Sequence, residues 1–445
     1  MHFDTVIHNG LIVTMNPAFE IIERGVLGIH AGKIAYLAME TSEKAAPEAK
    51  HSIDAGGSIV LPGLVNAHTH LPMTLFRGLA DDLPLDQWLN NYIFPAEAEH
   101  IQPDSVRWGT LLACCEMMLS GTTTCCDGYF YEDHVASAFQ ESSMRGVLAQ
   151  GLVDFPAPGV PDPDKNIDEA IAYLEKWKHK SPLIRPSIFC HSPYTCSEKT
   201  LKHAKRASLD NDVLFQIHVA ETFRERRECE RRHGVSPVRY LETLGLLDKN
   251  TLLVHAVWVD DTDLKVISET GACVAHVPES NMKLASGIAP LPAMLNASIT
   301  TGIGTDGSAS NNNMDLFESM DVCAKLHKVT ALDPTTVNAR TVLEMATISG
   351  ANSIGLGDTI GSLEIGKSAD IIIIDIKKPH LTPIYSPVSH LVYAVGGSDV
   401  TDVFIEGNHV VKKQKIITMN ADEIVEKVKM IGNSIQENTT GKGRK

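Results

Sequence analysis

The sequence predicts an α/β protein: a (β/α)8 barrel of the TIM type with a small β-sandwich domain formed from both chain ends. Three observations support this prediction. Short strand-like runs occupy both ends of the chain, apolar strands alternate with helical stretches between them, and eight such strands occur in this middle segment. Strands that alternate with helices indicate a parallel sheet, and eight repeats in roughly 300 residues fit a closed barrel.

The N-terminal 58 residues read as a β-rich unit with no helical period. Four strand-like runs occur there, at residues 4–9, 11–15, 25–30 and 33–38. Glycines separate them, as expected for turns between short strands.

The middle segment supplies the eight barrel strands, which we place at residues 59–66, 122–127, 147–154, 184–191, 213–218, 251–255, 272–277 and 299–304. Helical stretches lie between most of them. One runs over residues 103–119, with Pro103 at its start and Gly121 just after its end, and another covers residues 168–179. A doubly wound sheet needs fewer strands and usually carries a glycine-rich phosphate turn, which is not present here.

After about residue 356 the chain returns to strands, at residues 361–363, 371–375, 402–405 and 410–411. Each chain end alone is short for an independent core, so we expect the two ends to join. The predicted domains are therefore 1–58 with 363–420 as the sandwich, 59–362 as the barrel, and 421–445 as a C-terminal helix and polar tail.

Composition excludes several classes of partner. Lys and Arg number 39 against 55 Asp and Glu, a formal net charge of −16, which argues against nucleic-acid binding. No apolar run reaches ~18 residues, so no membrane span is expected. The N-terminus lacks the basic start and apolar run of a signal peptide, and we expect a cytoplasmic protein.

The nine cysteines are an odd number without a CxxC pair. We interpret them as reduced, mostly buried thiols in a reducing compartment. A soft metal site built from thiolates is the alternative.

Four predicted strands end in groups that bind metals. The first ends in His68 and His70, which are two residues apart and point to the same side of a strand. The others end in His218, His255 and Asp306. One such residue alone is more often a buried polar group with satisfied hydrogen bonds. Four strand ends together indicate a divalent metal ion, expected to be zinc, with iron or manganese as alternatives.

Seven stretches carry a resemblance to a known family: Leu61–His70, Met73–Gly78, His191–Tyr194, His218–Glu221, Pro278–Gly287, Gly304–Asn312 and Gly361–Asp370. On these stretches the chain is identified as a member of the amidohydrolase superfamily. Within it, the chain resembles the group of 5-methylthioadenosine/S-adenosylhomocysteine deaminases. The resemblance covers roughly residues 5 to 415.

The resemblance implies one metal ion held by His68, His70, His218 and Asp306. Two-metal members use a carboxylated lysine at the end of the fourth strand, where this chain has Cys190-His191. It also implies that Glu221 shuttles protons and contacts substrate, and that His255 and Asp306 orient and activate the hydrolytic water. The family's proteins suggest a homo-oligomer.

The resemblance further places substrate-binding residues, each with a structural alternative. Glu97 and His191 match positions that hold the sugar end of a nucleoside, although a glutamate in a first helical turn is usually a capping group. Trp88 lies on the long loop after the first strand and is expected to cover the site or to join the core. His276 and Glu279 are interpreted as structural rather than as ligands.

One position departs from the family pattern. Members that accept S-adenosylhomocysteine place an arginine before the Gly-Leu-Val-Asp of the third strand, where this chain has Gln150. An arginine–carboxylate hydrogen bond contributes ~1.5–3 kcal/mol. We therefore expect a hydrolytic deaminase that converts adenosine, 5′-methylthioadenosine or 5′-deoxyadenosine to the inosine analogue and ammonia, in preference to S-adenosylhomocysteine.

Two alternatives stay open. Related barrels act as deaminases or chlorohydrolases on guanine, pterins or triazines. Some members of the superfamily are non-catalytic scaffolds, but such proteins typically lose ligands, and every expected ligand is present here.

Overall fold

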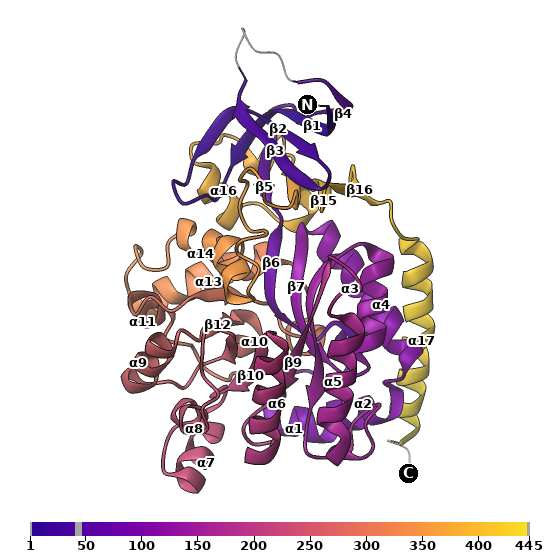
Figure 1. Ribbon diagram of the computed structural model, residues 1–445, viewed down its shortest axis with the longest axis vertical. Helices are drawn as coiled ribbons and strands as arrows, with labels where there is room; N and C mark the ends of the chain where they lie inside the picture. The colour runs from indigo at the N-terminus through magenta and orange to yellow at the C-terminus, as the bar shows by residue number, and fades with distance from the viewer. Residues whose placement is uncertain (1, 41–46, 443–445) are drawn as a thin grey trace.

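The computed structural model describes residues 2–40 and 47–442 of the chain. Figure 1 shows two parts: a barrel surrounded by helices, and a separate sheet in which the indigo first strands lie beside the late strands β15 and β16, while α17 runs along the barrel. The predicted fold class is confirmed.

The barrel consists of eight parallel strands in sequence order around the sheet. They are β6 (Leu64–Thr69), β7 (Thr122–Tyr129), β8 (Arg145–Leu152), β9 (Ile184–Cys190), β10 (Phe215–Val219), β11 (Thr251–His255), β12 (Cys273–His276) and β13 (Thr301–Ile303). Every strand of this set is buried along its whole length except at Arg185. Burial on both faces explains why these strands read as apolar runs rather than as alternating patterns.

The seam between β13 and β6 closes the barrel through polar contacts. The backbone N–H of Asp306 donates to the carbonyl of His68 at 3.0 Å. The side-chain amide of Asn66 donates to Thr305 Oγ1 at 2.8 Å, and its oxygen accepts from the backbone N–H of Thr305 at 3.1 Å. Both sides of this seam lead directly into expected metal ligands.

Helices follow the strands and cover the barrel. The long segment after β6 holds η1 (Leu71–Phe76), α1 (Leu85–Trp88), η2 (Leu89–Ile93), α2 (Phe94–His100) and α3 (Pro103–Leu119). The next connections contain α4 (Glu132–Ser142), η3 (Pro163–Lys165), α5 (Asn166–Trp177), α6 (Glu198–Asn211), α7 (Phe223–His233), α8 (Pro237–Thr243) and α9 (Asp261–Thr270). The last ones hold α10 (Pro278–Lys283), α11 (Leu291–Asn296), α12 (Ser308–Asn311), α13 (Leu316–Ala331), α14 (Ala339–Met345) and α15 (Ile348–Ser353).

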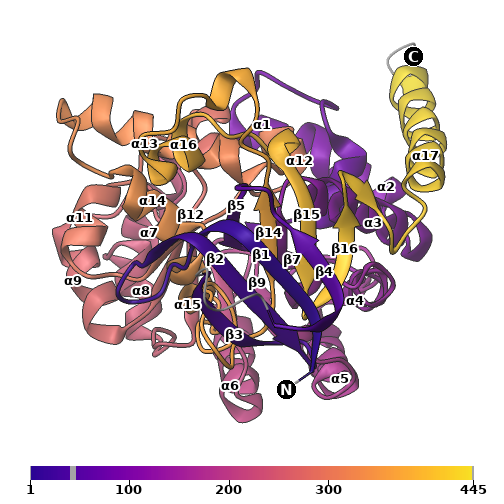
Figure 2. The same ribbon diagram turned by 90° about the horizontal axis from the view of Figure 1, so that it is seen from above.

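The chain ends form one hydrogen-bonded sheet of nine strands (Figure 2). Its order is β17-β16-β15-β14-β5-β1-β2-β3, with β4 also paired to β1. The early strands are β1 (Phe3–Val13), β2 (Ile21–His30), β3 (Lys33–Met39), β4 (Ala49–Asp54) and β5 (Ile59–Pro62); the late ones are β14 (Ile371–Ile374), β15 (Val400–Ile405), β16 (Asn408–Lys412) and β17 (Lys415–Ile416). The expected union of the two chain ends is therefore confirmed.

Gly63 divides what we predicted as a single first barrel strand, residues 59–66. β5 pairs with β14 and β1 in the chain-end sheet, and β6 pairs with β7 in the barrel. The Gly63 N–H donates to the Asp370 carbonyl at 3.0 Å, while Leu64 N–H donates to the Gly121 carbonyl at 3.0 Å. A Cβ at position 63 would lie 2.1 Å from the Thr123 hydroxyl oxygen, so only glycine fits this crossing.

Other boundaries also differ from the sequence prediction. The strands predicted at residues 4–9 and 11–15 belong to the single strand β1, and β4 was not predicted. Residues 361–363 form no strand: the Leu363 N–H donates to the carbonyl of Thr14, just after β1, and the Leu363 side chain packs in the core of the chain-end sheet. The C-terminal helix α17 (Ala421–Lys442) reaches far into residues 421–445, which we expected to hold a helix followed by a polar tail. Residues 443–445 lie outside the described residues, and the division into 1–58 with 363–420, 59–362 and 421–445 stays a prediction.

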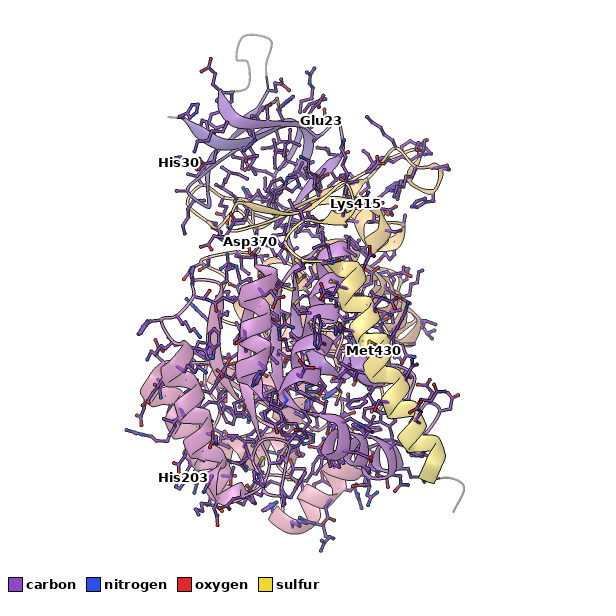
Figure 3. All side chains as sticks on the ribbon, turned by 90° about the vertical axis from the view of Figure 1, so that its right-hand side faces the viewer. Glu23, His30, His203, Asp370, Lys415 and Met430 are labelled. Carbon is purple, nitrogen blue, oxygen red and sulfur yellow. The ribbon has the colours of Figure 1, made fainter. Side chains whose placement is uncertain are left out.

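The remaining elements of the C-terminal region are η4 (Pro379–Leu381), α16 (Pro387–Tyr393) and η5 (Gly397–Asp399). Figure 3 shows α17 running along the outside of the barrel, with Met430 on it. Ile424 of α17 is buried with Leu111 and Cys115 of α3.

A buried ion pair joins the barrel to the chain-end sheet. Arg145, at the start of β8, donates to both carboxylate oxygens of Asp370 at 2.7 and 3.0 Å and to the Ser368 hydroxyl at 2.8 Å. Both charged side chains are at most 5% exposed. Asp370 lies at the junction of the two parts in Figure 3.

Among the described residues, no helix combines the length and the apolar character that a membrane crossing needs. All nine cysteines are buried and free of disulfide bonds, as expected.

Replacing Arg145 with alanine leaves the Asp370 carboxylate buried without its partner. We expect the free energy of unfolding to fall by about 3 kcal/mol or more, because breaking a buried pair costs that much. A urea titration measures it. The control is Arg107→Ala, which breaks the exposed pair with Glu141 and should cost less than about 1 kcal/mol. Equal losses in both variants would contradict the structural role of the buried pair.

Candidate active site

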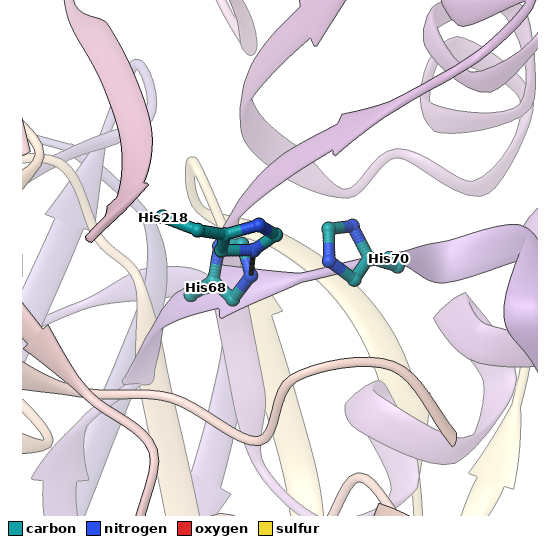
Figure 4. A group of neighbouring side chains, drawn as sticks. All are labelled: His68, His70 and His218. Atoms are coloured by element: carbon teal, nitrogen blue, oxygen red, sulfur yellow. Dashed lines mark hydrogen bonds between the residues drawn. The ribbon is translucent and has the colours of Figure 1, made fainter. Parts of the chain in front are cut away.

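The four expected metal ligands converge at the carboxyl ends of three barrel strands. His218 Nε2 lies 3.1 Å from His68 Nε2, and Asp306 Oδ1 lies 3.6 Å from His68 Nε2 and 3.4 Å from His70 Nε2. Figure 4 shows the rings of His68 and His218 close together with His70 facing them. Two ligands bound at 2.0–2.1 Å to a tetrahedral ion stand about 3.3 Å apart, so these separations fit one metal ion.

Hydrogen bonds orient two of these side chains. His70 Nδ1 donates to the Gly128 carbonyl at 2.7 Å, which leaves its Nε2 free to bind. Asp306 accepts from the Ser280 hydroxyl at 2.7 Å and from the Gly307 N–H at 2.8 Å. Outer contacts of this kind fix ring and carboxylate orientation in metal sites.

The electrostatics of the cluster also suit a cation. Burial lowers the pKa of His68 to about 4 and lowers the pKa of His70 and of His218, so the three imidazoles are neutral at pH 7. Burial acts to raise the pKa of Asp306, but the His68 hydrogen bond and the surrounding imidazoles outweigh it and hold that pKa well below its usual range. Three neutral imidazoles and one carboxylate are ligands that zinc accepts.

Glu221 and His255 stand beside the cluster. Glu221 follows β10, and its Oε2 lies 3.7 Å from His255 Nε2 at the end of β11. His255 Nδ1 lies 2.9 Å from the Asn281 amide oxygen, to which it can donate, and its Nε2 faces Glu221. Burial raises the pKa of Glu221, while the Ser286 hydroxyl donates to its other oxygen at 3.1 Å. A carboxyl group in this state can both donate and accept a proton.

Backbone strain gathers at the same strand ends. Ala220, His255, Ala256 and Asp306 all have positive φ angles, of 51°, 72°, 45° and 64°. Non-glycine residues rarely adopt this conformation, and it recurs at functional sites where the surrounding structure enforces it.

A cavity of about 390 Å³ opens over the cluster. Its wall includes Trp88 of α1, Glu97 of α2 and His191 after β9, together with Glu221 and His255. This volume lies in the range of small-molecule sites. The structure thus brings the expected substrate residues to one cavity, with the exception of Gln150.

The cavity residues are held by specific contacts. Glu97 accepts from the Tyr129 hydroxyl at 2.6 Å, and burial raises the pKa of Glu97 to about 7. His191 Nδ1 lies 3.0 Å from Thr195 Oγ1, and burial lowers the pKa of His191 to about 3. The indole N–H of Trp88 donates to the Ala80 carbonyl at 3.0 Å.

Gln150 does not line this cavity. Its side-chain oxygen accepts from the backbone N–H of Glu132 at 3.2 Å, and its amide lies 3.4 Å from the Gly151 carbonyl. The side chain of Gln150 holds the start of α4, and its expected role as a substrate-binding residue stays a prediction that this cavity does not support.

Sequence reasoning missed four residues that position the site: Tyr129, Glu225, Ser280 and Asn281. Glu225 is the least obvious, since it lies in a run of charged residues on α7 that reads as a solvated helix face. Its carboxylate accepts from the backbone N–H groups of Ala220 and Glu221 at 3.0 and 2.7 Å. Ser280 and Asn281 lie within Pro278–Gly287, one of the stretches that carry the family resemblance. Nothing else in the sequence indicated that they position the site.

A family model described as the amidohydrolase family matches residues 59–410. The chain belongs to this family. At the end of β9, where the resemblance places the carboxylated lysine of two-metal members, this chain has Cys190 and His191.

Among similar proteins, a 5-methylthioadenosine/S-adenosylhomocysteine deaminase of Syntrophobacter fumaroxidans is 46% identical over 97% of this chain and 98% of its own. A 5′-deoxyadenosine deaminase of Methanosarcina mazei is 41% identical over 95% and 96% of the two chains. The crystal structure of an adenosine deaminase from Xanthomonas campestris with bound zinc superposes with a TM-score of 0.95 at 33% identity, covering 98% and 99%.

Replacing His68 with alanine removes a nitrogen from the centre of the cluster, and we expect the protein to lose the ion of this site. Elemental analysis of the purified protein measures the loss. His191→Ala serves as the control, because the His191 ring lies in the same cavity but is not one of the four expected ligands. This variant should keep its metal content. A His68→Ala protein with unchanged metal content would refute the ligand assignment.

Proposed function

We propose that this amidohydrolase deaminates adenine nucleosides: water and the nucleoside give the inosine analogue and ammonia. The observation that carries the proposal is the position of Glu221, beside four metal ligands and inside a cavity that also contains Glu97 and His191. The names and identities of the similar deaminases support the same reaction. Cytoplasmic location and homo-oligomeric assembly remain predictions.

We assign His68, His70, His218 and Asp306 as the ligands of one divalent ion. Zinc is the ion we propose, on the basis of three imidazoles and a carboxylate and of the zinc-bound neighbour; iron and manganese bind similar ligands. When bound, such an ion supplies Lewis-acid activation of a water molecule.

The chain's own groups then move the protons. His255, with its free Nε2, and Asp306 orient the water and accept its proton, and the water oxygen bonds to C6 of adenine. Glu221 protonates N1 as C6 becomes tetrahedral, then takes the proton of the C6 hydroxyl and passes it to the amino group, so that ammonia leaves as the C–N bond breaks and the C6 carbonyl forms. The proton first taken from water returns from His255 and Asp306 to Glu221, which restores the starting state. The raised pKa of Glu221 suits a group that must be acid first and base afterwards.

Glu97 and His191 are assigned to the sugar end. The Glu97 carboxylate can accept hydrogen bonds from two sugar hydroxyls, and His191, held through Nδ1, presents its other nitrogen. Trp88 covers the nucleoside as part of the cavity wall. These roles follow the family resemblance and the common cavity.

The lining of the cavity limits the charge of the group that the nucleoside can carry at its 5′ position. Among the described residues, neither lysine nor arginine lines the inner cavity. A second, outer cleft shares Tyr194 and Glu221 with this cavity and is lined by arginines of α7. Three of these arginines form ion pairs with Asp86 or Glu228: Arg224, Arg231 and Arg232. We therefore still propose a preference for substrates with a neutral 5′ group. The argument now rests on the residues of the cavity wall and no longer on Gln150.

Glu221→Gln tests the proton shuttle. The amide keeps the size and the Ser286 contact but cannot carry the proton, so kcat should fall roughly 10²–10⁴-fold while the metal content stays unchanged. Ammonia release and elemental analysis measure the two effects. Near-normal turnover in this variant would remove Glu221 from the mechanism.

An ammonia-release screen on metal-analysed protein tests the substrate class. We expect adenosine, 5′-methylthioadenosine and 5′-deoxyadenosine to give higher kcat/KM than S-adenosylhomocysteine, since the inner cavity offers no cation to a carboxylate. Guanine, pterins and triazines should be inactive. A preference for S-adenosylhomocysteine would overturn the neutral-tail argument and point to Arg227, while activity confined to the other heterocycles would overturn the proposed function.

A further inference from the structure

A second cluster of metal-binding side chains lies outside the cavity wall. It consists of His276 at the end of β12 and of Cys323 and His327 on α13, and each is at most 1% exposed. The imidazole nitrogens and the thiol sulfur all lie within 4.8 Å of one another. None of the three lines the nucleoside cavity.

The geometry of this cluster matches that of the proposed catalytic centre. His327 Nε2 lies 3.1 Å from His276 Nε2, the same separation as between His218 and His68. Cys323 and His327 are four residues apart on one helix, so their side chains occupy the same face. A thiolate at about 2.3 Å from a tetrahedral ion would stand some 3.6 Å from each bound nitrogen. The Cys323 sulfur lies within 4.8 Å of both nitrogens.

The electrostatics favour neutral imidazoles. Burial lowers the pKa of His276 well below its ordinary value and the pKa of His327 to about 4. No carboxylate belongs to the cluster, so nothing there favours an imidazolium. In the described part of the chain, His276 Nδ1 has no hydrogen-bond partner. The alternative to a metal ion is a hydrogen bond between the two Nε2 atoms. That hydrogen bond would not involve the Cys323 thiol.

We propose that His276, Cys323 and His327 bind a second zinc ion, away from the nucleoside cavity. On binding, the Cys323 thiol loses its proton to solvent and the sulfur forms the bond to the ion, so that one proton is released per ion bound. Two imidazoles and a thiolate select borderline and soft ions over magnesium or calcium. The soft thiolate site considered from the cysteine pattern would thus involve one cysteine of the nine.

Such an ion would fasten α13 to β12 near the catalytic residues. Glu279 of α10 already accepts from the Ser319 hydroxyl of α13 and from the Asn311 amide, at 3.3 Å in the second case. The next two residues of α10, Ser280 and Asn281, hold Asp306 and His255. The ion would stabilise the helix against which this positioning pair is packed, without touching substrate.

Cobalt substitution tests the proposal, because a cobalt–thiolate bond gives an intense near-ultraviolet charge-transfer band. The four catalytic ligands include no sulfur, so this band reports on the second cluster alone. We expect the metal-depleted protein to bind two cobalt ions per chain and to show the band. Cys115→Ala, which removes another buried thiol, should keep both properties.

Cys323→Ala should bind one ion and lose the band, whereas His68→Ala should lose the catalytic ion and keep the band. Wild-type protein that binds one cobalt without the band would overturn the proposal, as would a band that survives in Cys323→Ala. The cobalt stoichiometry and the band of the wild-type protein test the proposal even if the Cys323 variant fails to fold. Because neither readout depends on turnover, the result is separate from the test of the deaminase reaction.

Discussion

The closed seam between β13 and β6 is the constraint on which the site depends. The hydrogen bond from Asp306 N–H to the His68 carbonyl and the Asn66–Thr305 pair bring the first and last strands of the barrel together. The side chains of His68 and Asp306, more than two hundred residues apart in the chain, are thereby brought to one cluster. The positive φ of Asp306 indicates that closure is achieved at some cost in backbone energy.

Around this seam, burial sets opposite protonation states for different groups. It lowers the pKa of the histidines, which favours the neutral imidazoles that a metal ion requires, and it raises the pKa of Glu221 and raises that of Glu97 to about 7. One physical effect thus produces ligands and acids in the same cavity, and the hydrogen bonds of Ser280, Asn281 and Tyr129 select the orientation of each group.

The sequence predicted the barrel, the union of the chain ends and the side chains at four strand ends, because these depend on local patterns and on strand geometry. It could not reveal contacts between distant segments. Glu225 looked like one charge among many on α7, and the environment of Gln150 depends on the start of α4. The break at Gly63 was hidden because β5 and β6 are both apolar and separated by one residue.

The shared sheet has a consequence for folding during synthesis. β5 ends at Pro62, and its neighbour β14 begins only at Ile371. At roughly 5–20 residues per second, translation of the intervening chain takes about 15–60 s. During that interval the edge of β5 that pairs with β14 has no partner strand, while the barrel emerges from the ribosome. An exposed strand edge is where unwanted pairing between nascent chains begins.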